Sequence, residues 1–227
     1  MDQIKLKKKI SELSKGDGKW NHYYNFNGVE TRPLSKELGD NTVKWRRINE
    51  LLKNTYKNKI ILDIGCSDGF FSNEIAKLNA KKVYGIDLNK IRIKRAKFAS
   101  KILNIKSTNF SVKNFYDIEV SNRQYDLVIA LGILHRVPEI YKFIERCSQI
   151  SNQLLIEFKT LDHKDPVCEF IGTNKKKYGM KSFFYFAPSI SFVTKVLEYF
   201  NFKKIEVLKD NLSNLKYKRT VILGSKK

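Results

Sequence analysis

The amino-acid sequence predicts a doubly wound α/β fold with a mostly parallel seven-stranded sheet and a C-terminal antiparallel hairpin. From residue 41 onwards, short apolar runs alternate with amphipathic segments of helical length, a pattern that builds βαβ units. The chain then ends with a helix and two strands instead of continuing the alternation. A length of 227 residues with 42% hydrophobic residues suits one substantial α/β domain.

The predicted strands are apolar runs that end at a glycine or a polar residue. The run from Ile60 to Ile64 ends at Gly65 and is typical of a buried parallel strand. The full set of predicted strands is 60–64, 82–86, 109–112, 125–131 and 154–158, followed by 203–208 and 218–223 as a hairpin.

The predicted helices follow from apolar residues at helical spacing and from capping residues. Asn89 is a suitable N-cap, and Pro138 suits the first turn of a helix. The predicted helices are 41–54, 70–78, 89–103, 138–150 and 189–199. Residues 1–40 are expected to form an irregular N-terminal arm or lid that starts with a short helix. Residues 41–227 then form the main domain, interrupted at 159–188 by a long insertion that we expect to cover the substrate.

The composition is strongly basic, with 44 Lys and Arg against 23 Asp and Glu and a net charge of +21. Such an excess indicates a nucleic acid, an anionic surface or an acidic substrate. The richness in Lys, Asn, Ile, Phe and Tyr is also typical of an A/T-rich genome, so both explanations stay open. No apolar run reaches the roughly 20 residues that span a membrane, and the lysine-rich start does not resemble a signal peptide. We therefore expect a cytoplasmic protein without a membrane segment.

The three cysteines, Cys66, Cys147 and Cys168, have neither metal-ligand spacing nor the even number of a disulfide framework. No metal site is expected from the sequence. The pattern of residues does not indicate an oligomeric state.

The turn after the first main strand carries the most informative spacing. Gly65 and Gly69 would allow a tight turn and a close ligand approach. A dinucleotide fingerprint needs a middle glycine for the pyrophosphate, and Ser67 stands there instead. Asp68 would repel a phosphate at the helix N-terminus. A ligand with a positive charge and no phosphate suits this loop, and Asp63 is placed to meet that charge.

An acidic residue stands about twenty residues after the turn that follows the first main strand. Asp87 closes the second main strand, where an acidic residue accepts hydrogen bonds from the ribose hydroxyls of a nucleoside. The alternative for Asp87 alone is a helix cap.

These residues carry a resemblance to a known family. The segment 63–69, the segment 85–87 and the segment 125–135 resemble the first, second and fourth-strand motifs of class I S-adenosylmethionine (SAM)-dependent methyltransferases, which have a Rossmann-like fold. The resemblance covers about 57–158 and implies a methyltransferase with SAM as cofactor. It implies that Asn114 and Phe115 flank the adenine and that Leu131 lines the ligand with its backbone. The implied cofactor residues are Asp63, Gly65, Cys66, Ser67, Gly69, Asp87, Leu88, Asn114, Phe115 and Leu131.

A narrower resemblance involves the family of the tRNA wobble-uridine carboxymethyltransferase and its small-molecule relatives. It rests on the segments 39–47, 132–136 and 184–189 together with the first loop. That family has Tyr-His where this chain has His135-Arg136, and this chain shows no clear equivalent of the lysine that holds the extra carboxylate of carboxy-SAM. These departures favour ordinary SAM.

Catalytic and substrate residues are expected around this cofactor. His135 follows the fourth strand, and its ordinary pKa of about 6.5 suits proton removal; the alternative is a histidine that only packs there. Glu157 is the second candidate base, and its alternative is a salt bridge to a lysine. Aromatic residues of the arm and the insertion could cover the acceptor or form a hydrophobic cluster at the sheet edge. These candidates are Trp20, Tyr23, Tyr24, Tyr178 and Tyr185, and Trp45 of the predicted helix 41–54 is a further substrate candidate.

Three functions remain from the sequence. The first is O-methylation of a small molecule, such as a sugar, a phosphorylated metabolite or a natural-product intermediate; an anionic group on this acceptor would suit the basic charge. The second is modification of tRNA or another RNA. The third is a non-catalytic module with a SAM-binding fold.

Overall fold

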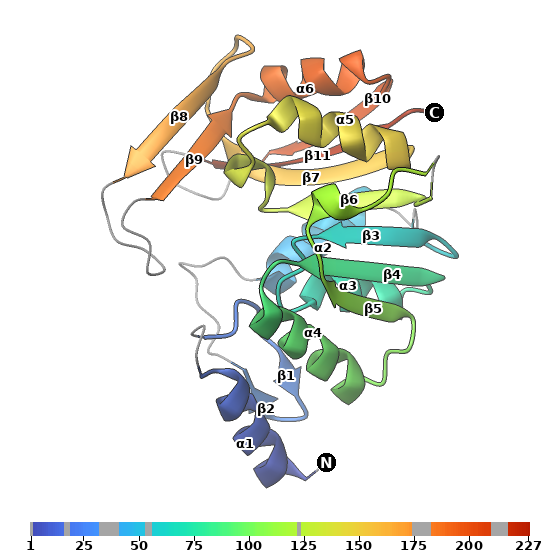
Figure 1. Ribbon diagram of the computed structural model, residues 1–227, viewed down its shortest axis with the longest axis vertical. Helices are drawn as coiled ribbons and strands as arrows, with labels where there is room; N and C mark the ends of the chain where they lie inside the picture. The colour runs from blue at the N-terminus through green and yellow to red at the C-terminus, as the bar shows by residue number, and fades with distance from the viewer. Residues whose placement is uncertain are drawn as a thin grey trace. The chain divides into compact units, whose positions relative to one another are not determined.

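The computed structural model describes residues 2–15, 19–31, 41–52, 56–121, 124–173, 183–209 and 218–227 (Figure 1). The chain divides into two compact units, residues 1–118 and 119–227, which are described in turn. The motif residues Gly39 and Asp40 and the predicted substrate residue Tyr178 lie outside the described residues.

The first unit contains three parallel strands joined by helices. Strands β3 (Ile60–Ile64), β4 (Lys82–Asp87) and β5 (Thr108–Val112) lie side by side in that order. Helix α3 (Phe70–Lys77) connects β3 to β4, and α4 (Lys90–Ile102) connects β4 to β5. A short 3-10 turn, η1 (Phe115–Asp117), follows β5. Asn89 accepts hydrogen bonds from the backbone N–H groups of Ile91 and Arg92, which confirms the predicted N-cap of α4.

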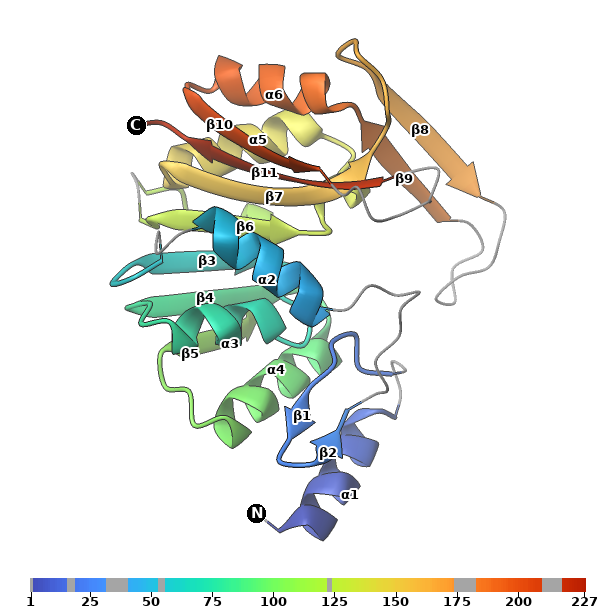
Figure 2. The same cartoon turned by 180° about the vertical axis from the view of Figure 1, so that it is seen from behind.

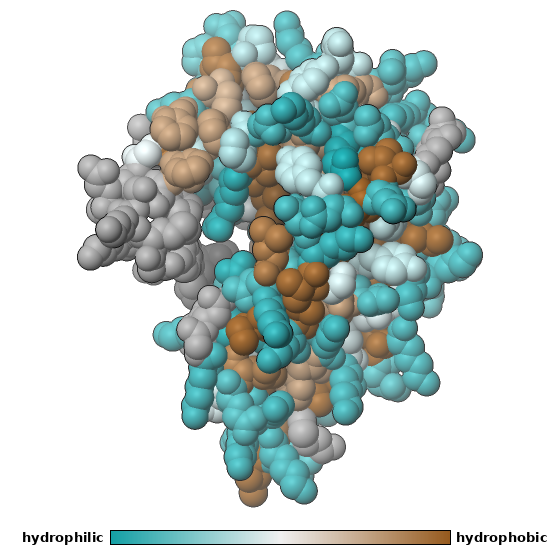
Figure 3. Space-filling model, viewed as in Figure 1, coloured by the Kyte–Doolittle hydropathy of each residue, from teal (hydrophilic) through white to brown (hydrophobic). Residues whose placement is uncertain are grey.

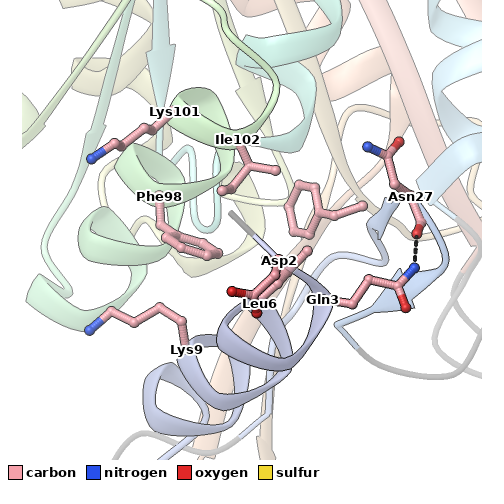
Figure 4. Close-up of a pocket in the computed structure, with 9 residues that line it drawn as sticks. Asp2, Gln3, Leu6, Lys9, Asn27, Phe98, Lys101 and Ile102 are labelled. Carbon is pink, nitrogen blue, oxygen red and sulfur yellow. Dashed lines mark hydrogen bonds between the residues drawn. The ribbon is translucent and has the colours of Figure 1, made fainter.

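The N-terminal arm has more regular structure than the sequence analysis expected. It begins with α1 (Gln3–Leu13) and continues in a hairpin of β1 (Asn25–Phe26) and β2 (Val29–Glu30). Asn27 and Gly28 have φ angles of 51° and 88°, as a two-residue hairpin turn requires. The Gln3 side chain donates a hydrogen bond to the Asn27 carbonyl, which connects α1 to this turn (Figure 4). Helix α2 (Asn41–Leu52) follows the arm as predicted.

The second unit contains four strands in the order β6-β7-β11-β10. Strands β6 (Leu127–Leu131) and β7 (Gln153–Thr160) are parallel, whereas β11 (Lys218–Ser225) is antiparallel to both β7 and β10 (Lys204–Lys209). Helices α5 (Ile140–Ile150) and α6 (Ile190–Tyr199) belong to this unit, and α5 contacts β7 (Figures 1 and 2). Among the described residues, seven strands belong to the main mixed sheet, so the predicted fold class with its C-terminal antiparallel hairpin is confirmed.

Two local predictions in the second unit need correction. The helix predicted from Pro138 begins at Ile140, because residues 134–136 first form a 3-10 turn, η2 (Leu134–Arg136). The insertion contains an unpredicted hairpin of β8 (Cys168–Thr173) and β9 (Phe183–Pro188). This hairpin carries exposed aromatic rings, including Phe170 and Phe184, which are 62% and 50% exposed. Figure 3 shows pale brown aromatic side chains gathered over this hairpin.

Close packing between β4 and β5 in the first unit depends on Gly85, which has no side chain. Cys66, Ile93, Ala96 and Phe110 form a buried cluster beneath the turn after β3. A Cβ atom on Gly85 would lie 2.4 Å from the Phe110 ring. The glycine before Ile86 and Asp87 is therefore required for β4 and β5 to pack at this place.

No helix in the described ranges is long and apolar enough to cross a membrane.

Candidate functional site

The loop after β3 makes the tight turn that its glycines predicted, with residues in the left-handed region of backbone conformation. Gly65 and Gly69 have φ angles of 69° and 77°, and Ser67 has a φ of 52°, which is uncommon for a residue other than glycine. A Cβ atom on Gly69 would lie 2.8 Å from both the Ala96 Cβ and the Phe110 ring. This close approach holds the loop against the cluster below it.

Asp87 is joined directly to this loop. One carboxylate oxygen accepts a hydrogen bond from the Ser67 N–H at 3.0 Å, and the other accepts from the Asn89 N–H at 2.8 Å. Each carboxylate oxygen has two acceptor positions, so both can still accept from a ligand hydroxyl. The helix-cap alternative is weakened, because Asn89 and not Asp87 caps α4. The structure thus brings together the two sequence motifs of the first unit.

Asp63 lies below the loop, on β3, and is only 3% exposed. Burial raises the pKa of its carboxyl to about 7, a hydrogen bond from the Ser72 hydroxyl opposes that rise, and the charge of Asp87 adds to it. Asp63 is therefore only partly ionised at neutral pH. Ser72 is a site residue that was not predicted, and its place on the buried side of α3 was the available signal.

The residues predicted to contact adenine have different surroundings. Leu88 is 71% exposed at the end of β4 and offers an open apolar surface. Asn114 caps η1 by accepting a hydrogen bond from the Tyr116 N–H at 3.1 Å. Phe115 is buried, whereas Tyr116 beside it is 44% exposed with ring centroids 5.5 Å apart. Tyr116 is an aromatic surface that the sequence analysis did not consider.

Asp68 contacts the N-terminal arm. Its carboxylate is fully buried and accepts hydrogen bonds from the backbone N–H groups of Asn21 and His22. Arg95 Nη1 lies 3.6 Å from its other oxygen. Burial raises the pKa of Asp68, while the charge of Arg95 and the two arm hydrogen bonds oppose the rise. From the sequence, Asp68 was expected only to repel phosphate; its partners in the arm lie more than 40 residues away and gave no local signal.

The arm residues predicted to contact an acceptor are mostly packing residues. Trp20 and Tyr24 are 1% and 5% exposed and pack against Phe26 and each other. Their burial supports the hydrophobic-cluster alternative. Tyr23 is half-buried and donates its hydroxyl proton to Glu30, and Trp45 is half-buried on α2.

In the second unit, His135 is buried in η2 and is 2% exposed. Within the part of the chain that the structure describes, its Nδ1 atom has no hydrogen-bond partner. Burial lowers the pKa of His135 to about 3, helped by the charges of Arg219, Arg136 and Lys159 and opposed by Glu157. The imidazole is therefore neutral at physiological pH.

Glu157 and Tyr185 also lie in this unit. The Glu157 carboxylate is buried and pairs with Arg219 at 3.1 Å, which supports the salt-bridge alternative with an arginine as the partner. The Tyr185 ring is buried, its centroid lies 6.3 Å from that of His135, and Lys159 Nζ lies 4.0 Å from the Tyr185 centroid.

Gly132, with a φ of 75°, lies in the turn after Leu131 at the end of β6. A Cβ atom there would lie 3.5 Å from a Glu157 carboxylate oxygen and 4.0 Å from the His135 ring. The structure thus gathers His135 and Glu157 around this turn. Nine of the ten predicted cofactor residues belong to the first unit, and Leu131 belongs to the second.

The first unit also contains a cavity of about 690 Å³ beneath the N-terminal arm (Figure 4). None of its lining residues was predicted for the site. They come from α1 and its N-cap, from β1 and the turn after it, and from α4: Asp2, Gln3, Leu6, Lys9, Phe26, Asn27, Phe98, Lys101 and Ile102.

Comparisons with curated proteins give two kinds of relative. The chain is 24% identical over 166 residues to a tRNA U34 carboxymethyltransferase of Aliarcobacter butzleri, which covers 72% of this chain and 53% of the relative. It is 30% identical over 151 residues to a ubiquinone biosynthesis O-methyltransferase of Pelagibacter ubique, covering 63% of this chain and 60% of that protein. The chain spans about half the length of the tRNA-modifying relative that it matches.

Solved structures share the fold. The N-terminal domain of EvdMO1 with SAH bound superposes with a TM-score of 0.76 at 15% identity, covering 100% of this chain and 98% of that one. The magnesium protoporphyrin IX methyltransferase of Synechocystis PCC 6803 with bound SAM gives 0.63 at 16% identity, covering 86% of each chain.

The family comparison agrees with the motifs described above. A family model described as a methyltransferase domain matches residues 55–184, more than half of the chain. This range contains the loop after β3, Asp87 and the turn after β6. The chain therefore belongs to the methyltransferase domain family.

Proposed function

We propose that this protein is a SAM-dependent methyltransferase that O-methylates a small-molecule acceptor such as a sugar, a phosphorylated metabolite or a natural-product intermediate. The observation that carries the proposal is the hydrogen bond between the Ser67 N–H and the Asp87 carboxylate. This bond joins the loop that turns at Gly65 and Gly69 to Asp87 at the end of the next strand, which is the arrangement of a nucleoside site.

The residues of the first unit fit SAM. Asp87 keeps free acceptor positions for ribose hydroxyls, and exposed Leu88 can cover one face of the adenine. Gly65 and Gly69 allow close approach of the ligand to the loop. Asp63 would favour a nearby ammonium group in its ionised form, although its burial limits this contribution.

SAM supplies a methyl group on a sulfonium, which is already an activated electrophile. The chain's own residues then have to align the acceptor and exclude water. A base is needed only where the acceptor loses a proton, as a hydroxyl does.

We assign the acceptor to the residues around Gly132. The unpartnered Nδ1 of neutral His135 can accept a hydrogen bond from a hydroxyl. Its lowered pKa makes it a weak base, so its first contribution would be to orient the hydroxyl. Glu157 would act as a positioning residue through its ion pair with Arg219. Arg219 and Lys159 support an anionic group on the acceptor.

Replacement of Asp87 tests the cofactor assignment. Asp87→Ala should abolish measurable binding of S-adenosylhomocysteine (SAH) in calorimetry, because the ribose would lose its acceptor. Asp162→Ala removes the same charge from an exposed position in the second unit and should bind like wild type. Unchanged SAH affinity of the Asp87 variant would refute the assignment.

An RNA acceptor is the second candidate function. The net charge of +21 favours it, as does the similarity to proteins named tRNA U34 carboxymethyltransferase. The similarity to a protein named ubiquinone biosynthesis O-methyltransferase, 30% identical over 151 residues, favours the small molecule.

A further inference from the structure

Residues 19–24 of the N-terminal arm, which we call the strap, contact the proposed cofactor loop. The Asn21 side-chain amide donates to the Ser67 hydroxyl at 2.8 Å. The backbone N–H groups of Asn21 and His22 donate to the Asp68 carboxylate. The Tyr24 hydroxyl donates to the Asp68 backbone carbonyl at 2.9 Å. The strap therefore binds two consecutive residues of the loop.

Arg95 of α4 anchors both the strap and the loop. Its side chain is fully buried. Nε donates to the Leu13 carbonyl at 2.8 Å, and Nη1 donates to the Lys19 carbonyl at 3.3 Å and faces Asp68 at 3.6 Å. The guanidinium also lies 5.7 Å from the Trp20 ring centroid. A buried arginine with these partners holds the strap in one position, because loss of a carbonyl would leave a buried donor unpaired and loss of Asp68 would leave the charge uncompensated.

The strap is connected to Asp87 through a single residue. Ser67 accepts from the Asn21 side chain and donates its N–H to the Asp87 carboxylate at 3.0 Å. Its φ of 52° is a conformation that residues other than glycine rarely adopt. The strap contacts therefore stabilise the loop conformation that directs this N–H toward Asp87.

We propose that Asn21 and Asp68 are positioning residues for the cofactor, and that docking of the strap and binding of the cofactor favour each other. The inference rests on the proposed function, since it assigns the loop and Asp87 to SAM. Coupling of this kind is reciprocal: a cofactor that prefers the strapped loop also stabilises the docked strap.

A double-mutant cycle on Asn21 and Ser67 tests the proposal. SAH affinity is measured by calorimetry for wild type, Asn21→Ala, Ser67→Ala and the double variant. We expect each single variant to bind about fivefold more weakly and the double variant to bind no more weakly than either, because one hydrogen bond is lost in all three. Glu12→Gln, on the same arm but outside the strap, is the control and should bind like wild type, because exposed Glu12 pairs with Lys9 within α1.

Asp68→Asn provides the second variant. It should weaken SAH binding about tenfold, as expected for loss of a charged acceptor, while its far-UV circular dichroism reports whether it folds. Should it not fold, the Asn21 variants still decide, because Asn21 is exposed.

Trypsin cleavage after Lys19 supplies an independent readout of the same coupling. SAH should slow cleavage in wild type and should slow it less in Asn21→Ala. The strap proposal would be overturned if Asn21→Ala bound SAH as tightly as wild type, or if the affinity losses of the two single variants added up in the double variant. Either result would leave the proposed function intact. Absence of SAH binding by the wild type would instead overturn the proposed function.

Discussion

At the residue scale, burial controls the ionisation of two predicted site residues. The pKa of Asp63 is raised to about 7 and that of His135 is lowered to about 3, in both cases mainly by loss of solvent. Both shifts favour the neutral side chain. The ordinary histidine pKa near 6.5, on which the sequence analysis relied for a base, therefore does not hold at this position.

His135 should make the protein sensitive to acid. Its folded pKa is below the unfolded value, so the unfolded chain binds a proton as the pH falls below about 6.5 while the folded chain does not. Between pH 7 and pH 5 this histidine should therefore cost about 1–2 kcal/mol of stability. Urea unfolding should show that His135→Gln loses less stability over this range than wild type does.

His163 offers the matched control, since its side chain is 47% exposed in the same unit. His163→Gln should follow the wild-type pH dependence. The pH profile of kcat gives a second test. We expect that the wild type shows no inflection near pH 6.5 that is absent from His135→Gln. Finding such an inflection would mean that His135 titrates normally and serves as an ordinary base.

At the element scale, the contact between β4 and β5 depends on Gly85. Gly85 is part of a sequence motif, and the structure supplies the physical reason for a glycine: a Cβ atom there would overlap Phe110. Motif glycines can thus be required for packing as well as for ligand approach.

Gly85→Ala should destabilise the protein by about 1–3 kcal/mol through overpacking. Thermal unfolding measures the loss. Gly172→Ala is the control, because no atom lies within 4 Å of the added methyl position in β8. The double variant Gly85→Ala, Phe110→Leu should recover part of the loss, since the smaller side chain makes room. If the double variant instead lost as much stability as the two single variants together, the steric explanation would be contradicted.

Most elements were predicted because their signals are local. The alternation of apolar and amphipathic segments located β3, β4, β6, β7 and the C-terminal hairpin. The β1–β2 hairpin was missed although Asn27-Gly28 is a strong hairpin signal, because the flanking strands have only two residues each. The start of α5 was placed too early because Pro138 was taken as its first turn.

At the scale of the whole molecule, the charge of +21 makes a prediction about partners. A tRNA transcript should bind at low salt by phosphate contacts alone, and fluorescence anisotropy should show this binding weakening by about a thousandfold between 50 and 200 mM salt. SAH affinity should change little over the same range.

Tight tRNA binding that persists at 200 mM salt, together with methyl transfer from SAM to that tRNA, would favour the RNA acceptor over the small molecule. If tRNA binding is weak and strongly salt-dependent and no methyl group is transferred, the positive charge is a general property of the surface and does not indicate an RNA acceptor.

By itself, the sequence determined the order of the main-sheet strands and of the helices between them, the glycine turn after β3 and the acid at the end of β4. These depend on periodicity and spacing within a few tens of residues. Only the tertiary structure decided that Trp20 is buried, that Asp68 holds the strap, and that Glu157 pairs with Arg219, 62 residues away. Burial and charge pairing depend on which distant segments pack together, and a local pattern does not contain that information.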